Sequence, residues 1–204
     1  VVLGRHEKVL LGPRRGAAST YAAGMSPRIP PVSLDDVDEP TREMLESLST
    51  LRDGDVRMLN VFGTMGQHPD LFRRWLRFAN HVLLKSTLSP RDRELAILRA
   101  GWRCNSPYEW GQHVVVGRSA GLTDAEIARV AEGPDAPEWT EPEAAIIRAT
   151  DELHDASTIS EPTWRTLTEH YSVQQRMDLV FAIGQAMDLL AAAGVPPPQG
   201  VQDT

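Results

Sequence analysis

Two consecutive predicted helices bring together side chains that could exchange protons. The segment contains two carboxylates, a tyrosine and a histidine: Glu94, Tyr108, Glu109 and His113. Glu109 and His113 are four residues apart and therefore share one face of a helix. Apolar residues stand three and four positions after Glu94, so its carboxylate is expected to be removed from water. The connection near residues 104–106 is very short, which makes the two helices neighbours.

This combination of side chains suits general acid–base catalysis. Removal from water penalises the charged form of a carboxyl group and so raises its pKa. A carboxyl group with a raised pKa beside an imidazole can give and take protons near neutral pH. Tyr108 adds a phenolic hydrogen-bond donor. The free backbone N–H groups at the start of the same helix suit an anionic ligand.

Each residue also has a structural interpretation. Glu109 lies three residues after Ser106 and could complete a capping box. His113 could be a buried histidine with satisfied hydrogen bonds. Glu94 could pair with an arginine of a partner subunit or with one of its own chain, Arg91 or Arg99. The nearby aromatic residues could be ordinary core residues: Trp102, Tyr108 and Trp110.

The elements that would position these side chains are all predicted to be helices. Helix starts are indicated by His68-Pro69, Ser89-Pro90 and Ser106-Pro107. Capping boxes are indicated by Thr123 with Glu126, Thr140 with Glu143, and Ser172 with Gln175. No alternating strand pattern of useful length occurs. The sequence therefore predicts an all-α helical bundle.

The helical region is expected to form one domain over residues 38–194. Residues 1–37 are predicted to be extended or disordered, and residues 195–204 to form a flexible tail that contains three consecutive prolines. Residues 1–24 lack the continuous apolar core of a signal peptide and are interpreted as an extension that precedes a native start at Met25. Without a targeting signal, the expected location is cytoplasmic.

Composition excludes several classes of partner. The 21 Lys and Arg residues against 28 Asp and Glu residues give a formal charge of −7, which argues against nucleic-acid binding. No run approaches the roughly 18 apolar residues of a membrane span, so no membrane partner is expected. The single cysteine, Cys104, excludes an intrachain disulfide and a two-cysteine redox centre within one chain.

A second cluster of titratable residues has the spacing of metal ligands. Asp151 and His154 are three residues apart, and Asp155 follows. A di-iron helical bundle needs two Glu-x-x-His motifs and two further glutamates. The chain offers one imperfect copy, so no metal site is predicted.

Several motifs along residues 29–193 match the pattern of one known family. They are Arg28-Ile-Pro-Pro, Asn60-Val-Phe, His68-Pro, Leu88-Ser-Pro-Arg-Asp-Arg-Glu94, Tyr108-Glu-Trp-Gly-Gln-His113, Ala120-Gly-Leu-Thr-Asp-Ala-Glu-Ile127, Asp151-Glu-Leu-His154 and Met177-Asp-Leu-Val180. With these motifs the chain resembles the carboxymuconolactone decarboxylase family, which shares its helical fold with the alkylhydroperoxidase D proteins. The resemblance implies a homo-oligomer, either a trimer or a hexamer. Exposed apolar residues within 71–82 and 177–193 are the expected contacts.

The chain departs from the alkylhydroperoxidase D motif at its two cysteines. Aligning the family's glutamate and histidine on Glu94 and His113 puts Ser106 and Glu109 at the cysteine positions. Tyr108 falls where a second histidine of the proton relay stands. Neither Ser106 nor Glu109 can form a sulfenic acid or a disulfide, so dithiol peroxidase activity is disfavoured. A thiol-dependent peroxidase acting through Cys104 stays open as an alternative, as does a non-catalytic oligomer that binds a small molecule.

The resemblance implies a lyase or isomerase that needs no cofactor and acts on a small carbonyl, carboxylate or lactone substrate. In that interpretation His113 is the general base or acid, and Glu94 orients it. Tyr108 donates to a developing oxyanion, and Glu109 is the second acid–base group. Arg99 or Arg103 could hold a substrate carboxylate.

Overall fold

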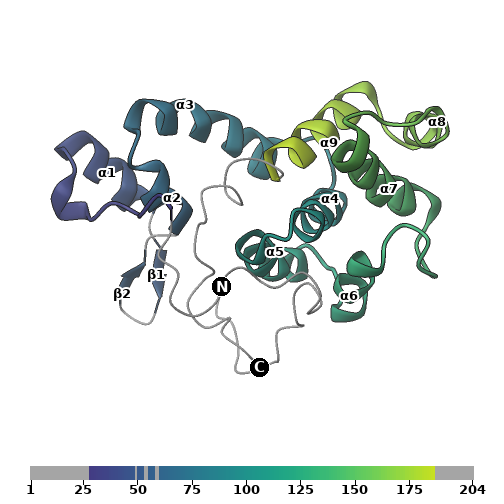
Figure 1. Cartoon of the computed structure of the whole chain (residues 1–204), viewed down its shortest axis with the longest axis horizontal. Helices are drawn as coiled ribbons and strands as arrows, with labels where there is room; N and C mark the ends of the chain where they lie inside the picture. Colours follow the sequence, from purple (N-terminus) through teal and green to yellow (C-terminus); the bar gives the residue numbers. More distant parts are fainter. Residues whose placement is uncertain (1–27, 49, 53–54, 58–59, 187–204) are drawn as a thin grey trace.

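The computed structural model describes residues 28–48, 50–52, 55–57 and 60–186, which form mainly α-helices (Figure 1). The first elements are the 3₁₀ helix η1 (Leu34–Asp36), α1 (Glu39–Ser47), the strands β1 (Thr50–Arg52) and β2 (Asp55–Arg57), and α2 (Asn60–Met65). They are followed by α3 (Pro69–Asn80), the π-helix η2 (His81–Lys85), α4 (Pro90–Arg103) and α5 (Pro107–Ser119). The last helices are α6 (Asp124–Glu132), α7 (Glu141–Ala156), α8 (Glu161–His170) and α9 (Val173–Ala186). The predicted all-α fold class is confirmed.

A small hairpin between α1 and α2 differs from the expectation that the chain contains no strand. β1 and β2 are antiparallel, with Leu51 opposite Val56. Each strand has three residues, which is too short for hydrophobic alternation to be recognised. Residues 1–27 of the predicted N-terminal segment and the predicted tail at 195–204 lie outside the described residues. The proposed domain boundaries stay predictions.

Helix α4 is the centre of the fold. Ser89 caps its start by accepting a hydrogen bond from the Asp92 N–H, and Pro90 occupies its first turn. All residues from 93 to 101 are buried, whereas a helix at a protein surface buries one face only. This burial follows from packing against α5, α6, α7 and α9 on different sides. Charged residues within this stretch are therefore placed inside the protein.

The connection between α4 and α5 is a tight turn that brings the two helices side by side. Cys104 ends α4, and Asn105 takes the left-handed backbone conformation with φ of 49°, which asparagine tolerates better than most residues. Ser106 then caps α5 by accepting from the Glu109 N–H. This turn brings the start of α5 beside the end of α4.

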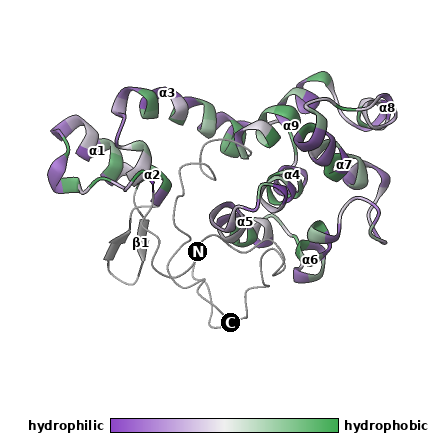
Figure 2. Ribbon diagram, viewed as in Figure 1, coloured by the Kyte–Doolittle hydropathy of each residue, from purple (hydrophilic) through white to green (hydrophobic). Residues whose placement is uncertain are grey.

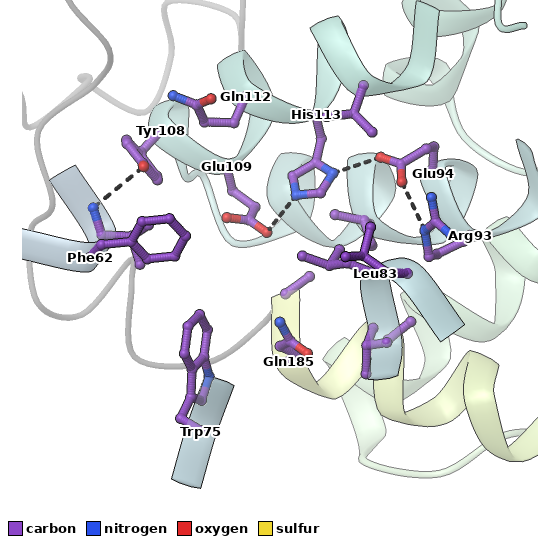
Figure 3. A pocket seen from close by; sticks show the side chains of 17 residues that line it. Phe62, Trp75, Leu83, Arg93, Glu94, Tyr108, Glu109, Gln112, His113 and Gln185 are labelled. Carbon is purple, nitrogen blue, oxygen red and sulfur yellow. Dashed lines mark hydrogen bonds and ion pairs between the residues drawn. The ribbon is translucent and has the colours of Figure 1, made fainter. Parts of the chain in front are cut away.

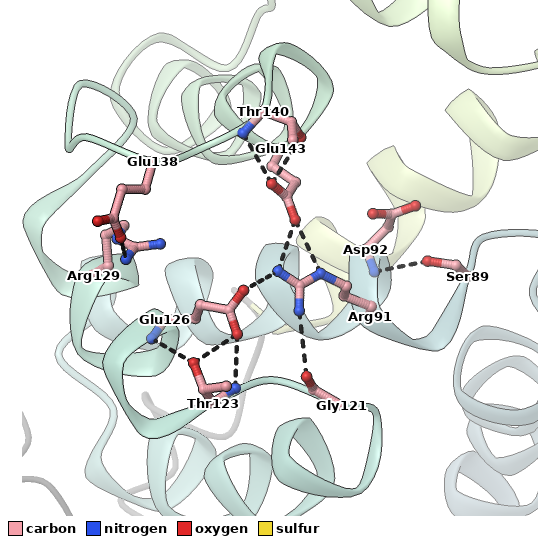
Figure 4. Close-up of polar contacts among 10 residues, drawn as sticks. All are labelled: Ser89, Arg91, Asp92, Gly121, Thr123, Glu126, Arg129, Glu138, Thr140 and Glu143. Atoms are coloured by element: carbon pink, nitrogen blue, oxygen red, sulfur yellow. Dashed lines mark hydrogen bonds and ion pairs between the residues drawn. The ribbon is translucent and has the colours of Figure 1, made fainter.

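Three helix starts are tied together by one arginine (Figure 4). Arg91 donates to Glu126 and, at 2.9 Å from Nε, to Glu143. These two glutamates also complete the predicted capping boxes of α6 and α7, which are confirmed. Arg91 thereby joins α4 to both helix starts, and its hydrogen bond lowers the pKa of Glu126 to about 2.

The outer helices are amphipathic and leave some apolar side chains exposed. Hydrophobic and hydrophilic residues alternate in bands along α3 and α1 (Figure 2). Within the segments expected to form subunit contacts, the exposed side chains include Leu71, Phe78, Met177 and Phe181. Phe78 and Phe181 meet edge to face, with ring centroids 5.7 Å apart. The homo-oligomer itself stays a prediction. Among the described residues, no helix combines the length and apolarity needed to cross a bilayer.

A single carboxylate holds the segment between α3 and α4 against α9. Asp178 accepts hydrogen bonds from the Thr87 N–H at 2.6 Å and the Thr87 hydroxyl at 2.7 Å, and its other oxygen lies 2.9 Å from His81 Nε2. Burial alone would raise the pKa of Asp178, but these bonds lower it to about 2. The π-helix η2 is thereby fixed in place.

Replacing this carboxylate should destabilise the protein in a pH-dependent way. We expect Asp178→Asn to lower the free energy of unfolding at neutral pH by about 1–2 kcal/mol, because hydrogen bonds to a charged acceptor are lost. The native carboxylate has a depressed pKa, so its contribution is complete above about pH 4 and disappears as the pH falls toward about 2. Urea unfolding at several pH values measures both effects.

The exposed Asp135, paired with Arg148 at the surface, provides the matched control. Asp135→Asn should change the free energy of unfolding little, since exposed ion pairs contribute little. An Asp178→Asn deficit that is equally large at about pH 2 would contradict the role assigned to the carboxylate.

Candidate functional site

A cavity of about 290 Å³ lies between α2, α3, η2, α4, α5 and α9 (Figure 3). Most of its lining is apolar and includes Val61, Phe62, Trp75, Leu83 and Ile97. Its polar lining residues are Arg93, Glu94, Tyr108, Glu109, Gln112, His113 and Gln185. The structure therefore brings all of the site residues predicted from sequence to the wall of one cavity.

His113 lies between two carboxylates. Its Nδ1 is 2.6 Å from Glu94 Oε2, and its Nε2 is 3.4 Å from Glu109 Oε1. Glu94 comes from α4, whereas Glu109 and His113 lie one helical turn apart on α5. The side chains of Glu109 and His113 are each 11% exposed and that of Glu94 is fully buried. The close Glu94 contact fixes which edge of the imidazole faces Glu109.

The two carboxylates favour the charged form of the imidazole. Burial alone would lower the pKa of His113. The hydrogen bond to Glu94 and the negative charges of Glu109 and Glu94 outweigh burial, and the pKa of His113 is raised. His113 is therefore suited to donate a proton, while Glu109 beside its Nε2 is suited to accept one.

Glu94 has an arginine partner that sequence reasoning missed. Arg93 Nε donates to Glu94 Oε1 at 3.0 Å, so both carboxylate oxygens have partners. The arginines considered earlier lie elsewhere: Arg91 binds Glu126 and Glu143, and Arg99 binds Asp151. Adjacent residues do not face each other on a regular helical pattern, so spacing could not indicate the Arg93–Glu94 pair.

Tyr108 lies against α2 at the cavity wall. Its hydroxyl oxygen accepts a hydrogen bond from the Val61 N–H at 3.4 Å, which leaves the hydroxyl proton to be donated elsewhere. Burial raises the pKa of Tyr108 to about 12. The side chain is therefore neutral at physiological pH and suits the predicted role of a donor.

The capping interpretation of Glu109 holds only for its backbone. The Glu109 N–H donates to Ser106 Oγ at 3.4 Å, as a helix cap requires. The Ser106 N–H donates to Gly101 O at 2.9 Å, and the Glu109 carboxylate lines the cavity beside His113. The side chain of Glu109 thus lies at the cavity wall beside His113.

The other residues considered from sequence lie outside this cavity. Arg99 makes a two-point ion pair with Asp151, at 2.6 and 2.8 Å, and Arg103 pairs with Asp155. Neither arginine lines the cavity, so the suggestion that one of them holds a substrate carboxylate is not supported by their position. His154 contacts Asp155 at 2.9 Å. Within the described ranges, no group of metal-ligating side chains is present.

Gln185 and Trp75 are further cavity residues that sequence reasoning missed. Gln185 lies on α9 and Trp75 on α3. Each is far in sequence from residues 94–113, and only tertiary packing brings them there. Ordinary helical spacing contains no signal for either one.

Comparison with a protein-family model identifies residues 69–152 as a match to the carboxymuconolactone decarboxylase family. This range contains Glu94, Tyr108, Glu109 and His113. A comparison with curated proteins finds no match.

Two of the solved structures with a similar fold are described as AhpD proteins, and a third is a debrominase. An alkylhydroperoxidase AhpD core from Ralstonia eutropha JMP134, an uncharacterised peroxidase-related protein, has 19% identity and a TM-score of 0.67, covering 85% of this chain and 93% of its own. A protein of unknown function from Agrobacterium tumefaciens, a candidate AhpD antioxidant defence protein, has 22% identity and a TM-score of 0.61. The match covers 66% of this chain and 94% of the Agrobacterium protein. A cysteine-to-alanine variant of the debrominase Bmp8 in complex with 2,3,4-tribromopyrrole has 16% identity and a TM-score of 0.64. The match covers 86% of this chain and 94% of the debrominase.

The surroundings of Cys104 disfavour the thiolate form of its side chain. It ends α4 and is not among the residues that line the cavity. Burial, and then the negative charge of Glu109, raise the pKa of the Cys104 thiol. The thiolate is the nucleophilic form, so its fraction at neutral pH is reduced.

Alkylation kinetics should show this suppression. We expect iodoacetamide to label the folded protein more slowly at neutral pH than the urea-unfolded chain. The labelling rate should continue to rise above about pH 8.5, where an ordinary thiol is half ionised. Since the chain has one cysteine, Cys104→Ala provides the blank. Faster labelling of the folded protein at neutral pH would instead favour thiol chemistry.

Proposed function

Because residues 69–152 match the model of the carboxymuconolactone decarboxylase family, we propose that the chain is a cofactor-free acid–base enzyme. Its reaction is a proton transfer next to the carbonyl group of a small carbonyl, carboxylate or lactone compound, of the lyase or isomerase type. The observation that carries this proposal is the placement of His113 between Glu94 and Glu109 at the wall of a cavity.

In the proposed reaction Glu109 is the base. Its carboxylate removes a proton from the carbon next to the substrate carbonyl, and the electron pair of that C–H bond moves toward the carbonyl oxygen. The oxygen becomes negative and accepts hydrogen bonds from the His113 Nε2–H and the Tyr108 hydroxyl. Return of a proton to another carbon completes an isomerisation, and both catalytic groups recover their starting state.

Glu94 acts as a positioning residue in this scheme. It accepts the Nδ1–H of His113 at 2.6 Å and is itself bound by Arg93. This chain of contacts sets the direction of the imidazole and stabilises its charged form. The arrangement supports His113 as the acidic partner of the reaction, a charged donor to the developing oxyanion, rather than as its base.

The ligand of one similar structure supports a small ring compound as the substrate. The debrominase variant was solved with a small ring compound, 2,3,4-tribromopyrrole. A cavity of about 290 Å³ in this chain suits a molecule of comparable class. Thiol peroxidase chemistry has weaker support, because Cys104 does not line the cavity and the pKa of its thiol is raised.

Proton exchange into simple carbonyl compounds tests the proposal. We expect the protein to accelerate exchange of α-protons in 2-indanone and isomerisation of α-angelica lactone, followed by NMR in deuterium oxide. His113→Ala should reduce the acceleration of these reactions by about 10²–10³-fold, the usual contribution of one donor to a developing oxyanion.

His154→Ala provides the matched control, because that histidine lies on α7 outside the cavity. It should leave the rate unchanged. Exchange by His113→Ala at the rate of the unmodified protein would refute the proposal.

A further inference from the structure

The proposed function does not specify whether the substrate is neutral or charged. The charged and polar groups of the cavity wall indicate which of the two it is. Resting on that function, we propose that the site binds neutral ring compounds that carry a hydrogen-bond donor, and that it rejects free carboxylates.

The charged groups of the cavity are paired with one another. Arg93 binds Glu94 at 3.0 Å, and His113 lies between Glu94 and Glu109. With His113 protonated, two positive and two negative charges cancel. Among the described lining residues, Arg93 is the one arginine or lysine, and Glu94 already binds it. A substrate carboxylate would therefore add an uncompensated negative charge to a largely apolar cavity.

The start of α5 does not provide an anion site either. A helix N-terminus attracts negative charge through its free N–H groups and dipole. Here Glu109 occupies the first turn, and its own N–H donates to Ser106. The protein's own carboxylate thus lies where an anionic ligand was expected from sequence.

The apolar part of the cavity favours a flat ring. Phe62, Trp75, Leu83 and Ile97 supply aromatic and aliphatic surface to its lining. A volume of about 290 Å³ lies just below the range of about 300–1,000 Å³ that is usual for ligand pockets. One substituted ring is the size that such a space accommodates.

Gln185 indicates the second polar group of the ligand. Its Oε1 is buried and, among the described residues, has no hydrogen-bond partner. Gln185 comes from α9, whereas the charged residues come from α4 and α5 (Figure 3). A buried acceptor without a partner is costly. A ligand N–H or O–H that reaches Gln185 would remove that cost, while its carbonyl oxygen accepts from His113.

Three probes of nearly equal shape distinguish the effect of ligand charge on affinity from the effect of a hydrogen-bond donor on the ligand. Benzamide is a neutral carbonyl compound with an N–H donor, acetophenone lacks the donor, and benzoate is an anion. Their affinities for the full chain at neutral pH are measured by NMR titration. We expect benzamide to bind at least about tenfold more tightly than benzoate, with acetophenone between them.

Two variants assign these preferences to residues. Glu109→Gln removes one negative charge and should reduce the ratio of the benzamide affinity to the benzoate affinity by about tenfold. Gln185→Leu should weaken the binding of benzamide by several-fold and leave the binding of acetophenone unchanged. The exposed Glu138, paired with Arg129 outside the cavity, supplies the control Glu138→Gln, which should alter no affinity.

The inference is overturned if benzoate binds as tightly as benzamide, or if benzamide shows no saturable binding. If Gln185→Leu weakened the binding of benzamide and of acetophenone equally, the ligand would not need a hydrogen-bond donor for Gln185. Binding of these probes needs no turnover, so such results would leave His113-dependent proton exchange standing. Conversely, a failure of the exchange experiment would not change the order of the three affinities.

Discussion

The carboxylate of Glu94 is completely buried, and the rest of the site depends on how its charge is compensated. A buried charge is tolerated only when it is paired and hydrogen-bonded. Arg93 supplies one partner from the same helix, and His113 supplies the other from α5. Since the second partner must reach across the helix pair, the position of α5 against α4 and the orientation of the imidazole are linked to this one group.

The electrostatics of the cavity follow from the same pairing. The contact with Glu94 turns Nε2 of His113 toward Glu109, which lies 3.4 Å away. Two carboxylates on one imidazole favour its charged form despite burial. The consequence is an acid beside a base on a wall whose charges cancel, facing apolar side chains from α2, α3, η2 and α9. Such a wall favours proton transfer and disfavours a charged ligand.

Local sequence patterns were sufficient to predict the helical fold and the proximity of three cavity residues. Capping boxes such as Thr123 with Glu126 specify helix starts through contacts within one turn. The four-residue spacing and the short turn after α4 placed Glu109, His113 and Glu94 together. Gln185 could not be found in this way, because packing of α9 brings it to the cavity. The π-helical turn η2 was also missed, since it follows α3 without a break in the helical pattern.

The protonation state of His113 tests this account most directly. NMR chemical shifts of its two ring nitrogens, followed across pH, report whether each carries a proton. The account predicts a titration midpoint above the usual pKa of about 6.5, with both nitrogens protonated below that midpoint. A midpoint at or below that value would contradict the central role of the Glu94–His113–Glu109 arrangement.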